Sequence, residues 1–217
     1  MTQVAEPGSV RSDAPAPGRI NHWIGGRWVA GTSGREGQVF DPATGQVTKV
    51  VDFASADELG AAVAAAKAAY PAWRATSLSK RTDIMFKIRN LVETHRHALA
   101  AHLTAEHGKV PSDALGEIAR GLENLEFACG IPNLMKGGYS EQASTGIDVY
   151  SIKQPLGVCV GITPFNFPAM VPMWMFANAL ACGNTFVLKP SEKDPSVSMF
   201  VGELLKQAGL PDGTYNI

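Results

Sequence analysis

The pattern of apolar and polar positions is most regular between residues 155 and 217. Continuous apolar runs at 155–163 and 184–190 are typical of strands that are buried on both faces of a sheet. Between these runs the pattern predicts a helix over 168–182, with proline in its first position and Gly183 just past its end.

A second helix is predicted after 190, beginning at Asp194-Pro195 and ending before Gly209, and "GTYNI" then begins a third strand. The resulting order is β-α-β-α-β. Such crossovers require parallel strands with helices packed on the sheet, so we expect a Rossmann-type α/β fold. Two crossovers make only half of a doubly wound domain, and we therefore expect a truncated chain.

The first part of the chain predicts strands and turns. Residues 20–30 read as a hairpin, because Gly25-Gly26 tolerates the positive φ angles of a tight turn between two apolar runs. Turn chemistry at Asp41-Pro42 and Gly45 precedes a strand near 46–53.

Long helices come next. Ser55 and Glu58 form a capping box, and the alanine-rich helix that follows is expected to reach about Ala69, where Pro71 closes it. The apolar spacing predicts one long helix over 79–106.

Three further features follow in this region. Gly108 is a candidate for the left-handed residue after the helix over 79–106. Another helix is predicted over 112–129, and the alternation in 147–153 predicts a half-buried strand.

These elements divide the chain into three parts. Residues 1–19 are rich in Pro, Ala, Gly and Ser and are expected to be a disordered tail. Residues 20–154 form a region of strands and helices, and residues 155–217 form the first half of a dinucleotide-binding domain.

Composition narrows the functional classes. The chain has 217 residues, 45% of them hydrophobic and 18% charged, with a net charge of −1. This balance gives no basic surface for nucleic acid or an anionic membrane. The amino terminus lacks the apolar segment of a secretory signal, so we expect a cytoplasmic protein.

The cysteines and histidines give no obvious chemistry. Cys129, Cys159 and Cys182 lie in apolar surroundings without metal-like spacing, so neither a disulfide framework nor a thiolate nucleophile is expected. No metal-ligand pattern emerges among the histidines, and we interpret all five as surface residues. They are His22, His95, His97, His102 and His107.

Candidate chemistry lies at the carboxyl ends of the two buried strands, where open parallel sheets bind ligands. "TPFNFP" follows the first strand, and "KPSEK" follows the second. Asn166 either donates from its amide to a developing negative charge or only satisfies backbone groups before the next helix. Lys189 and Glu192 either hold ribose hydroxyls or form a solvated ion pair. The chain contains no G-x-G-x-x-G, so the usual glycine fingerprint is not what would hold a dinucleotide.

Arg120 is a third candidate. It lies on the helix predicted over 112–129, with Glu117 and Glu123 three residues before and after it. Either the three side chains form a surface network worth roughly 0.2–0.5 kcal/mol per pair, or the guanidinium binds a substrate carboxylate.

The stretch "QPLGVCVGITPFNFPAMVPMWMFANALACGNTFVLKPSEKDP" resembles the aldehyde dehydrogenase family. The resemblance extends back through "EHGK", "FDPATG" and "INHWIGGRWV", and covers about residues 20–217. "PFNFP" and "KPSE" together are highly specific. "RGLENLEFACG" and "ACGNTFVLKPSE" are most similar to the CoA-acylating methylmalonate-semialdehyde dehydrogenases.

The resemblance implies a reaction and roles for residues. A cysteine thiolate attacks the aldehyde of methylmalonate or malonate semialdehyde, and hydride passes to NAD. Coenzyme A then accepts the acyl group and the substrate carboxylate is lost, which gives propionyl-CoA or acetyl-CoA. Asn166 would stabilise the oxyanion, and Arg120 would bind the substrate carboxylate. The cofactor-binding residues would be Thr163, Phe165, Lys189, Glu192 and Lys193.

The resemblance also implies what is missing. The nucleophilic cysteine and the general-base glutamate of the family would lie beyond Ile217, so this polypeptide alone is expected to be inactive. A homo-oligomer is expected for the whole protein. The alternative is a non-catalytic remnant or an oligomerisation partner, because the hairpin at 20–30 and the strand at 147–153 resemble the family's oligomerisation elements.

Overall fold

Three parallel strands form the sheet that the apolar runs predict. In the computed structural model, which describes residues 18–217, the strand order is β10-β9-β8. Two crossover helices, α6 and α7, connect these strands and confirm the predicted β-α-β-α-β order. The bounds are β8 Val158–Ile162, α6 Met170–Ala181, β9 Thr185–Lys189, α7 Ser196–Gln207 and β10 Tyr215–Asn216. Helix α6 therefore begins two residues later than predicted.

The expected burial on both faces holds for β9 and is wrong for β8. The first four residues of β9 are buried, and only Lys189 is exposed. In β8, Val160 is 62% exposed and Ile162 is 71% exposed. The reason is that β8 is an edge strand among the described residues, and α1 covers the face of the sheet around Val187 but not these two side chains.

The amino-terminal strands form a small sheet and a hairpin. Strands β2 and β3 confirm the predicted hairpin, with Gly25 and Gly26 at φ of 61° and 73°. Strand β1 pairs in parallel with β5, which also pairs with β4. The bounds are β1 Arg19–Ile20, β2 His22–Ile24, β3 Arg27–Val29, β4 Glu36–Asp41 and β5 Gln46–Asp52. Most of the predicted tail, residues 1–17, lies outside the described residues, and Arg19 is already in a strand.

Helix α1 (Ala56–Ala75) begins at the predicted capping box, in which Ser55 and Glu58 bond reciprocally to each other's backbone N–H. The expectation that Pro71 ends this helix is wrong, since the helix continues to Ala75. The physical reason is the packing of Trp73, two residues after the proline. Trp73 is fully buried and its indole N–H donates to the carbonyl of Leu180 at 3.1 Å, which holds the last turn against α6.

The single helix predicted over 79–106 is two helices, α2 (Leu78–Thr94) and α3 (Arg96–His107). The helix breaks at His95, whose ψ is 13°. The rings of His95 and His102 pack edge-on against Phe200 of α7, at centroid distances of 5.7 and 5.6 Å. Gly108 ends α3 in the left-handed region, as predicted.

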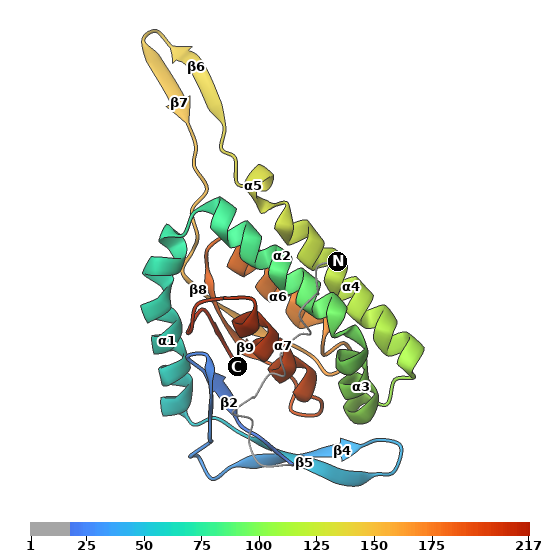
Figure 1. Cartoon of the computed structure of the whole chain (residues 1–217). Coiled ribbons are helices and arrows are strands. Elements are labelled where there is room, and N and C mark those ends of the chain that lie inside the picture. The colour runs from blue at the N-terminus through green and yellow to red at the C-terminus, as the bar shows by residue number, and fades with distance from the viewer. Residues whose placement is uncertain (1–17) are drawn as a thin grey trace, which may run out of the picture.

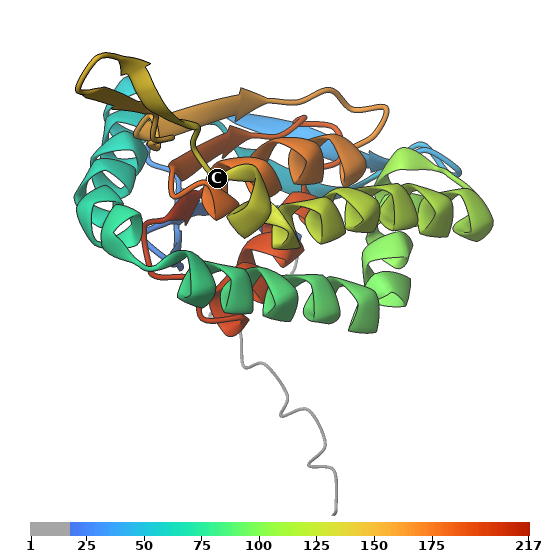
Figure 2. The same ribbon diagram turned by 90° about the horizontal axis from the view of Figure 1, so that it is seen from above.

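Helix α4 (Pro111–Cys129) confirms the prediction over 112–129 and lies against α6, as the view in Figure 2 shows. Gly121 permits this close approach, because a Cβ there would lie 2.4 Å from the sulfur of Met173. A short helix, α5 (Ile131–Leu134), follows. The main core joins α2, α3 and α4 to α6, α7 and the sheet. Within residues 18–217 no helix is both long and apolar enough to cross a membrane.

A second hairpin, β6 (Tyr139–Ser144) and β7 (Ile147–Tyr150), projects from the body of the molecule (Figure 1). Every residue of both strands is exposed, so the half-buried strand predicted at 147–153 is not half-buried in this chain. The apolar positions of its alternating pattern, Ile147 and Val149, are exposed like their neighbours, at 54% and 52%. No other element of the described chain covers them.

Candidate functional site

The two candidate loops start side by side at one edge of the sheet. Ile162 pairs with Lys189 in the parallel ladder, and the backbone N–H of Thr163 donates to the carbonyl of Lys189 at 3.1 Å. Farther out, the ammonium of Lys193 lies 4.2 Å from the centroid of the Phe165 ring. The structure therefore brings "TPFNFP" and "KPSEK" together, as expected for the carboxyl ends of adjacent parallel strands.

Asn166 lies at the middle of the first loop and is exposed. Among residues 18–217 its side-chain amide has no hydrogen-bond partner; only its backbone carbonyl is bonded. The alternative role, satisfying the start of α6, belongs to another residue. Glu117 of α4 accepts from the backbone N–H groups of Ala169 and Met170, at 2.8 and 3.1 Å. The amide of Asn166 is thus left available to a ligand.

Glu117 is buried, and its charge is balanced by Lys109. The side chain of Glu117 is 1% exposed, and its second oxygen accepts from the ammonium of Lys109. The same ammonium donates to the backbone carbonyl of Asn166 at 2.8 Å and lies 4.2 Å from the centroid of the Phe167 ring. One lysine therefore contacts the loop on its backbone and on a ring.

An equivalent arrangement holds the second loop. Glu106 accepts from the backbone N–H of Ser196 at 3.0 Å, at the start of α7, and its side chain is 2% exposed. The ammonium of Lys49 lies 2.8 Å from Glu106 and 2.9 Å from the hydroxyl of Ser196. A carboxylate at a helix amino terminus is favoured by the partial positive charge of the unpaired N–H groups there.

Lys189 and Glu192 form an ion pair with a distance of 2.9 Å. Their side chains are 58% and 48% exposed, so the pair adds less than ~1 kcal/mol to stability and both groups can exchange partners. The hydrogen bond from Lys189 holds the pKa of Glu192 below its usual range. At neutral pH the carboxylate is therefore ionised, which suits it to accept hydrogen bonds from hydroxyl groups.

A cavity of about 670 Å³ lies beside this pair. Its lining is mostly apolar and includes the exposed side chains of Val160 and Ile162 on β8. Thr163 follows Ile162 in the chain but does not line the cavity; it is buried, and its hydroxyl oxygen has no partner among the described residues. An apolar surface beside an exposed carboxylate–ammonium pair fits a nucleotide with ribose hydroxyls.

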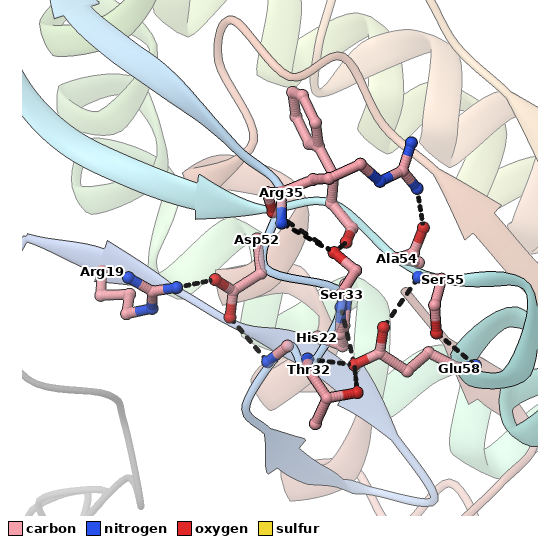
Figure 3. A network of polar contacts seen from close by, with 11 residues as sticks. Arg19, His22, Thr32, Ser33, Arg35, Asp52, Ala54, Ser55 and Glu58 are labelled. Carbon is pink, nitrogen blue, oxygen red and sulfur yellow. Dashed lines mark hydrogen bonds and ion pairs between the residues drawn. The ribbon is translucent and has the colours of Figure 1, made fainter.

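Part of the cavity wall comes from the amino-terminal strands and the start of α1. Figure 3 shows the polar contacts among residues of this region. Glu58 accepts from the backbone and hydroxyl of Thr32 and from the backbone N–H of Ser55. These bonds, above all the one from Ser55, lower the pKa of Glu58 to about 2. Asp52 accepts from Arg19 and from the backbone of Gly31. The carboxylates of Glu58 and Asp52 are thus bonded internally and hold this part of the wall together.

Asp194 is a buried carboxyl between the two loops and α7. It is 2% exposed, and one of its oxygens has no hydrogen-bond partner among residues 18–217. Burial raises the pKa of Asp194 to about 7, and the charges of Glu106 and Glu117 act in the same direction, while Ser191 and Lys109 oppose them. Asp194 is thus partly protonated at neutral pH.

Arg120 lies on the exposed surface of α4. Its guanidinium is 67% exposed and pairs with Glu123 at 2.9 Å. The three-residue surface network is incomplete, because Glu117 is buried and bonds to Lys109 and to the start of α6. No contact joins Arg120 to the two loops among the described residues. A role in binding a substrate carboxylate stays a prediction.

The cysteines are free, and burial raises the pKa of each thiol. None is therefore activated as a thiolate. Within residues 18–217 no three metal-ligating side chains gather at one place. The interpretation of all five histidines as surface residues is wrong for His22, which is 9% exposed; its Nε2 lies 3.9 Å from Glu58. His95, His102 and His107 are half-buried, and only His97 is exposed.

Sequence reasoning missed Lys109, Glu117, Glu106 and Lys49 as residues of the site. Glu117 appeared only as a neighbour of Arg120, and "EHGK" appeared only as part of a resemblance. The one available signal was the motif itself, since Glu106 and Lys109 are its first and last residues. Glu106 lies 57 residues from Lys49 and 90 from Ser196, and Lys109 lies 57 residues from Asn166, so no local pattern indicates these contacts. Only Glu117 is near in sequence, eight residues after Lys109.

The sheet order and the two loops define an α/β protein with a candidate ligand site at the carboxyl ends of β8 and β9. A sequence model of the aldehyde dehydrogenase family matches residues 28–217. The chain therefore belongs to the aldehyde dehydrogenase family.

Similar proteins are semialdehyde dehydrogenases. A malonate-semialdehyde dehydrogenase of Pseudomonas aeruginosa is 47% identical over 200 residues, which cover 92% of this chain and 40% of the relative. An acylating, mitochondrial methylmalonate-semialdehyde dehydrogenase of Arabidopsis thaliana is 49% identical over 201 residues, covering 93% and 33%. The chain thus spans two fifths or less of the length of these relatives.

Solved structures give the same result. A protein from Sinorhizobium meliloti, crystallised with NAD and provisionally assigned as a methylmalonate-semialdehyde dehydrogenase, superposes with a TM-score of 0.90 at 53% identity. The methylmalonate-semialdehyde dehydrogenase of Oceanimonas doudoroffii superposes with a TM-score of 0.89 at 49% identity. Each match covers 91% of this chain and 40% of the solved chain.

Proposed function

We propose that this chain supplies the oxyanion-stabilising and nucleotide-binding loops of an NAD-dependent, CoA-acylating semialdehyde dehydrogenase. Malonate semialdehyde would yield acetyl-CoA and CO₂, and methylmalonate semialdehyde would yield propionyl-CoA and CO₂, with NAD reduced to NADH. The observation that carries the proposal is the contact between the two loops, through Thr163 with Lys189 and Lys193 with Phe165. The names of the similar proteins support the substrate class.

Asn166 is the residue to which we assign a catalytic role. Its exposed amide N–H would donate to the carbonyl oxygen of the aldehyde as negative charge develops there. Pro164 and Pro168 stiffen the turn on both sides, so the donor is oriented before the reaction begins. Removal of one such donor typically raises the barrier by ~2.7–4 kcal/mol.

The second loop would hold the cofactor. Glu192 would accept from ribose hydroxyls, and Lys189 and Lys193 would donate to hydroxyl or phosphate oxygens. Thr163, whose buried hydroxyl is unpaired, and Phe165 would line the nicotinamide side. NAD, when bound, supplies the hydride acceptor. An acidic residue on the ribose favours NAD over NADP, which carries an extra phosphate there.

The carboxylate of the substrate would bind Arg120. At 67% exposure, the pair of Arg120 with Glu123 is worth little, so exchanging Glu123 for a substrate carboxylate would cost little. Burial raises the pKa of Cys129, Cys159 and Cys182, so we assign the nucleophilic thiolate to none of them. The thiol of coenzyme A would attack the acyl-cysteine thioester and release the cysteine thiolate.

The test is NADH formation from malonate and methylmalonate semialdehyde, with and without coenzyme A, by the protein that contains this chain. Asn166→Ala should lower kcat by about 10²–10³. The matched control is Asn133→Ala, because Asn133 is an exposed asparagine on α5. Equal turnover by the Asn166→Ala and Asn133→Ala proteins would exclude the assigned role.

A second proposal concerns assembly. The hairpin of β6 and β7 projects from the body and exposes Tyr139, Ile147, Val149 and Tyr150, which are 52–73% exposed. Strand edges with exposed apolar side chains favour pairing with another chain. We propose that this hairpin contributes to a homo-oligomer of the whole protein. Light scattering should report a smaller assembly for Ile147→Lys/Val149→Lys than for the unaltered protein, and an unchanged mass would argue against the hairpin.

A further inference from the structure

Lys109 is the residue where the amino-terminal helices reach the "PFNFP" turn. It follows Gly108, whose left-handed conformation ends α3 and redirects the chain toward α4. Its side chain is only 14% exposed, and its ammonium makes three contacts that converge on the turn. They are the bond to the Asn166 carbonyl at 2.8 Å, the ion pair with Glu117 and the approach to the Phe167 ring at 4.2 Å.

Glu117 holds the other side of the same turn. Its Oε1 accepts from the backbone N–H groups of Ala169 and Met170, while its Oε2 accepts from Lys109. The lysine and the glutamate therefore hold the segment from Asn166 to Met170, the lysine at the Asn166 carbonyl and the glutamate at the N–H groups three and four residues later. Removing the lysine charge leaves a buried carboxylate without its partner, which is strongly unfavourable.

The backbone of the turn is consequently held from Asn166 to the start of α6, and the bond from the Thr163 N–H to the Lys189 carbonyl holds its other end. Only the side-chain torsions of Asn166 remain to orient its amide. We propose that Lys109 and Glu117 are positioning residues that set the direction of the Asn166 amide at the carboxyl ends of β8 and β9. This inference rests on the proposed role of Asn166 as an oxyanion donor. It also gives a purpose to the lysine of "EHGK", which the sequence alone left without one.

The test is an NMR measurement on the 217-residue chain labelled with ¹⁵N-asparagine, in which the loss of a signal in Asn166→Asp identifies the Asn166 amide. In Lys109→Met the Asn166 side-chain signals should shift and their order parameter should fall. Backbone N–H exchange at Ala169 and Met170, followed on uniformly labelled chain, should speed up about tenfold or more. The control is Lys87→Met, since Lys87 is an exposed lysine on α2. Identical Asn166 signals in the Lys109→Met and Lys87→Met chains would overturn the proposal.

Two conservative variants cover the case in which Lys109→Met fails to fold. Lys109→Arg keeps the positive charge and should restore part of the protection at Ala169 and Met170. Glu117→Gln keeps an acceptor oxygen for those two N–H groups but releases Lys109, so it should still shift the Asn166 signals. Unchanged Asn166 signals in Glu117→Gln would overturn the proposal. Because this readout needs no turnover, absence of aldehyde oxidation would count against the proposed function and not against the positioning.

Discussion

Glu106 and Glu117 each cap the amino terminus of one of the two crossover helices of the sheet. Glu106 accepts from the first backbone N–H of α7, and Glu117 accepts from the N–H groups at the start of α6. Both side chains are almost fully buried, and each is paired with a lysine, Lys49 or Lys109. Helices α3 and α4 thus hold the ends of both candidate loops, where α7 and α6 begin.

Glu106→Ala should destabilise the protein by at least about 2 kcal/mol. The change removes a helix cap and one partner of a largely buried ion pair. Urea unfolding measures the loss. The control is Glu126→Ala, because Glu126 is 52% exposed in its pair with Arg89 and should cost less than ~1 kcal/mol. Equal losses for the two variants would contradict a structural role for the buried cap.

Asp194 should make stability fall as pH rises from about 4 to 7. Its pKa is raised to about 7 in the folded protein, so the folded state retains a proton that the unfolded state has lost. The contribution is full below the ordinary pKa of 3.8 and is lost as pH rises through the folded pKa, with a slope of up to ~1.4 kcal/mol per pH unit.

Asp194→Asn mimics the protonated form and should flatten this slope. The charged groups that act on Asp194 are Glu106, Glu117 and Lys109, and all three are unaltered in the variant. Chemical unfolding of both proteins at several pH values measures the difference. The stability of the variant relative to the unaltered protein should increase from pH 4 to pH 7; parallel pH profiles would show that Asp194 does not titrate in this range.

Pro71→Ala should stabilise the protein by ~1 kcal/mol or more. Pro71 lies inside α1 and is exposed, so alanine loses no buried contact. Proline in a helix interior costs ~3 kcal/mol or more. This cost exceeds the ~0.4–1 kcal/mol by which proline stabilises a protein through the lower conformational entropy of its unfolded chain. Thermal unfolding is the measurement. Pro132→Ala is the control, because Pro132 lies in the first turn of α5, where proline is tolerated. A lower melting temperature for Pro71→Ala would refute the explanation.

Tyr215→Phe should leave stability unchanged or raise it by up to ~1 kcal/mol. The hydroxyl of Tyr215 is buried without a hydrogen-bond partner among residues 18–217, and burial raises its pKa above the usual range. Its ring, by contrast, packs against Phe176 and Phe186 at 5.2 and 6.3 Å. Tyr215→Ala should therefore cost ~3–5 kcal/mol. If Tyr215→Phe proved as costly as alanine in urea unfolding, the hydroxyl would have a partner.

The sequence by itself determined the features whose causes are local. Gly25-Gly26 specifies its turn, Ser55 with Glu58 specifies the start of α1, and Gly108 specifies the end of α3. Each depends on residues within one helical turn of each other. The β-α-β-α-β order also follows from local patterns, because apolar runs and helical spacing alternate and crossovers of that length require parallel strands.

Only the tertiary structure decided which buried charges meet. Lys49 lies 57 residues from Glu106 and 147 from Ser196, and Glu117 lies 52 residues from Ala169. His95, where the helix breaks, likewise packs against a residue that is distant in sequence, Phe200. A carboxylate looks the same in a sequence whether it is solvated or buried. Its role is fixed by the desolvation that follows from packing, and by the distant lysine and helix terminus that packing brings within hydrogen-bond reach.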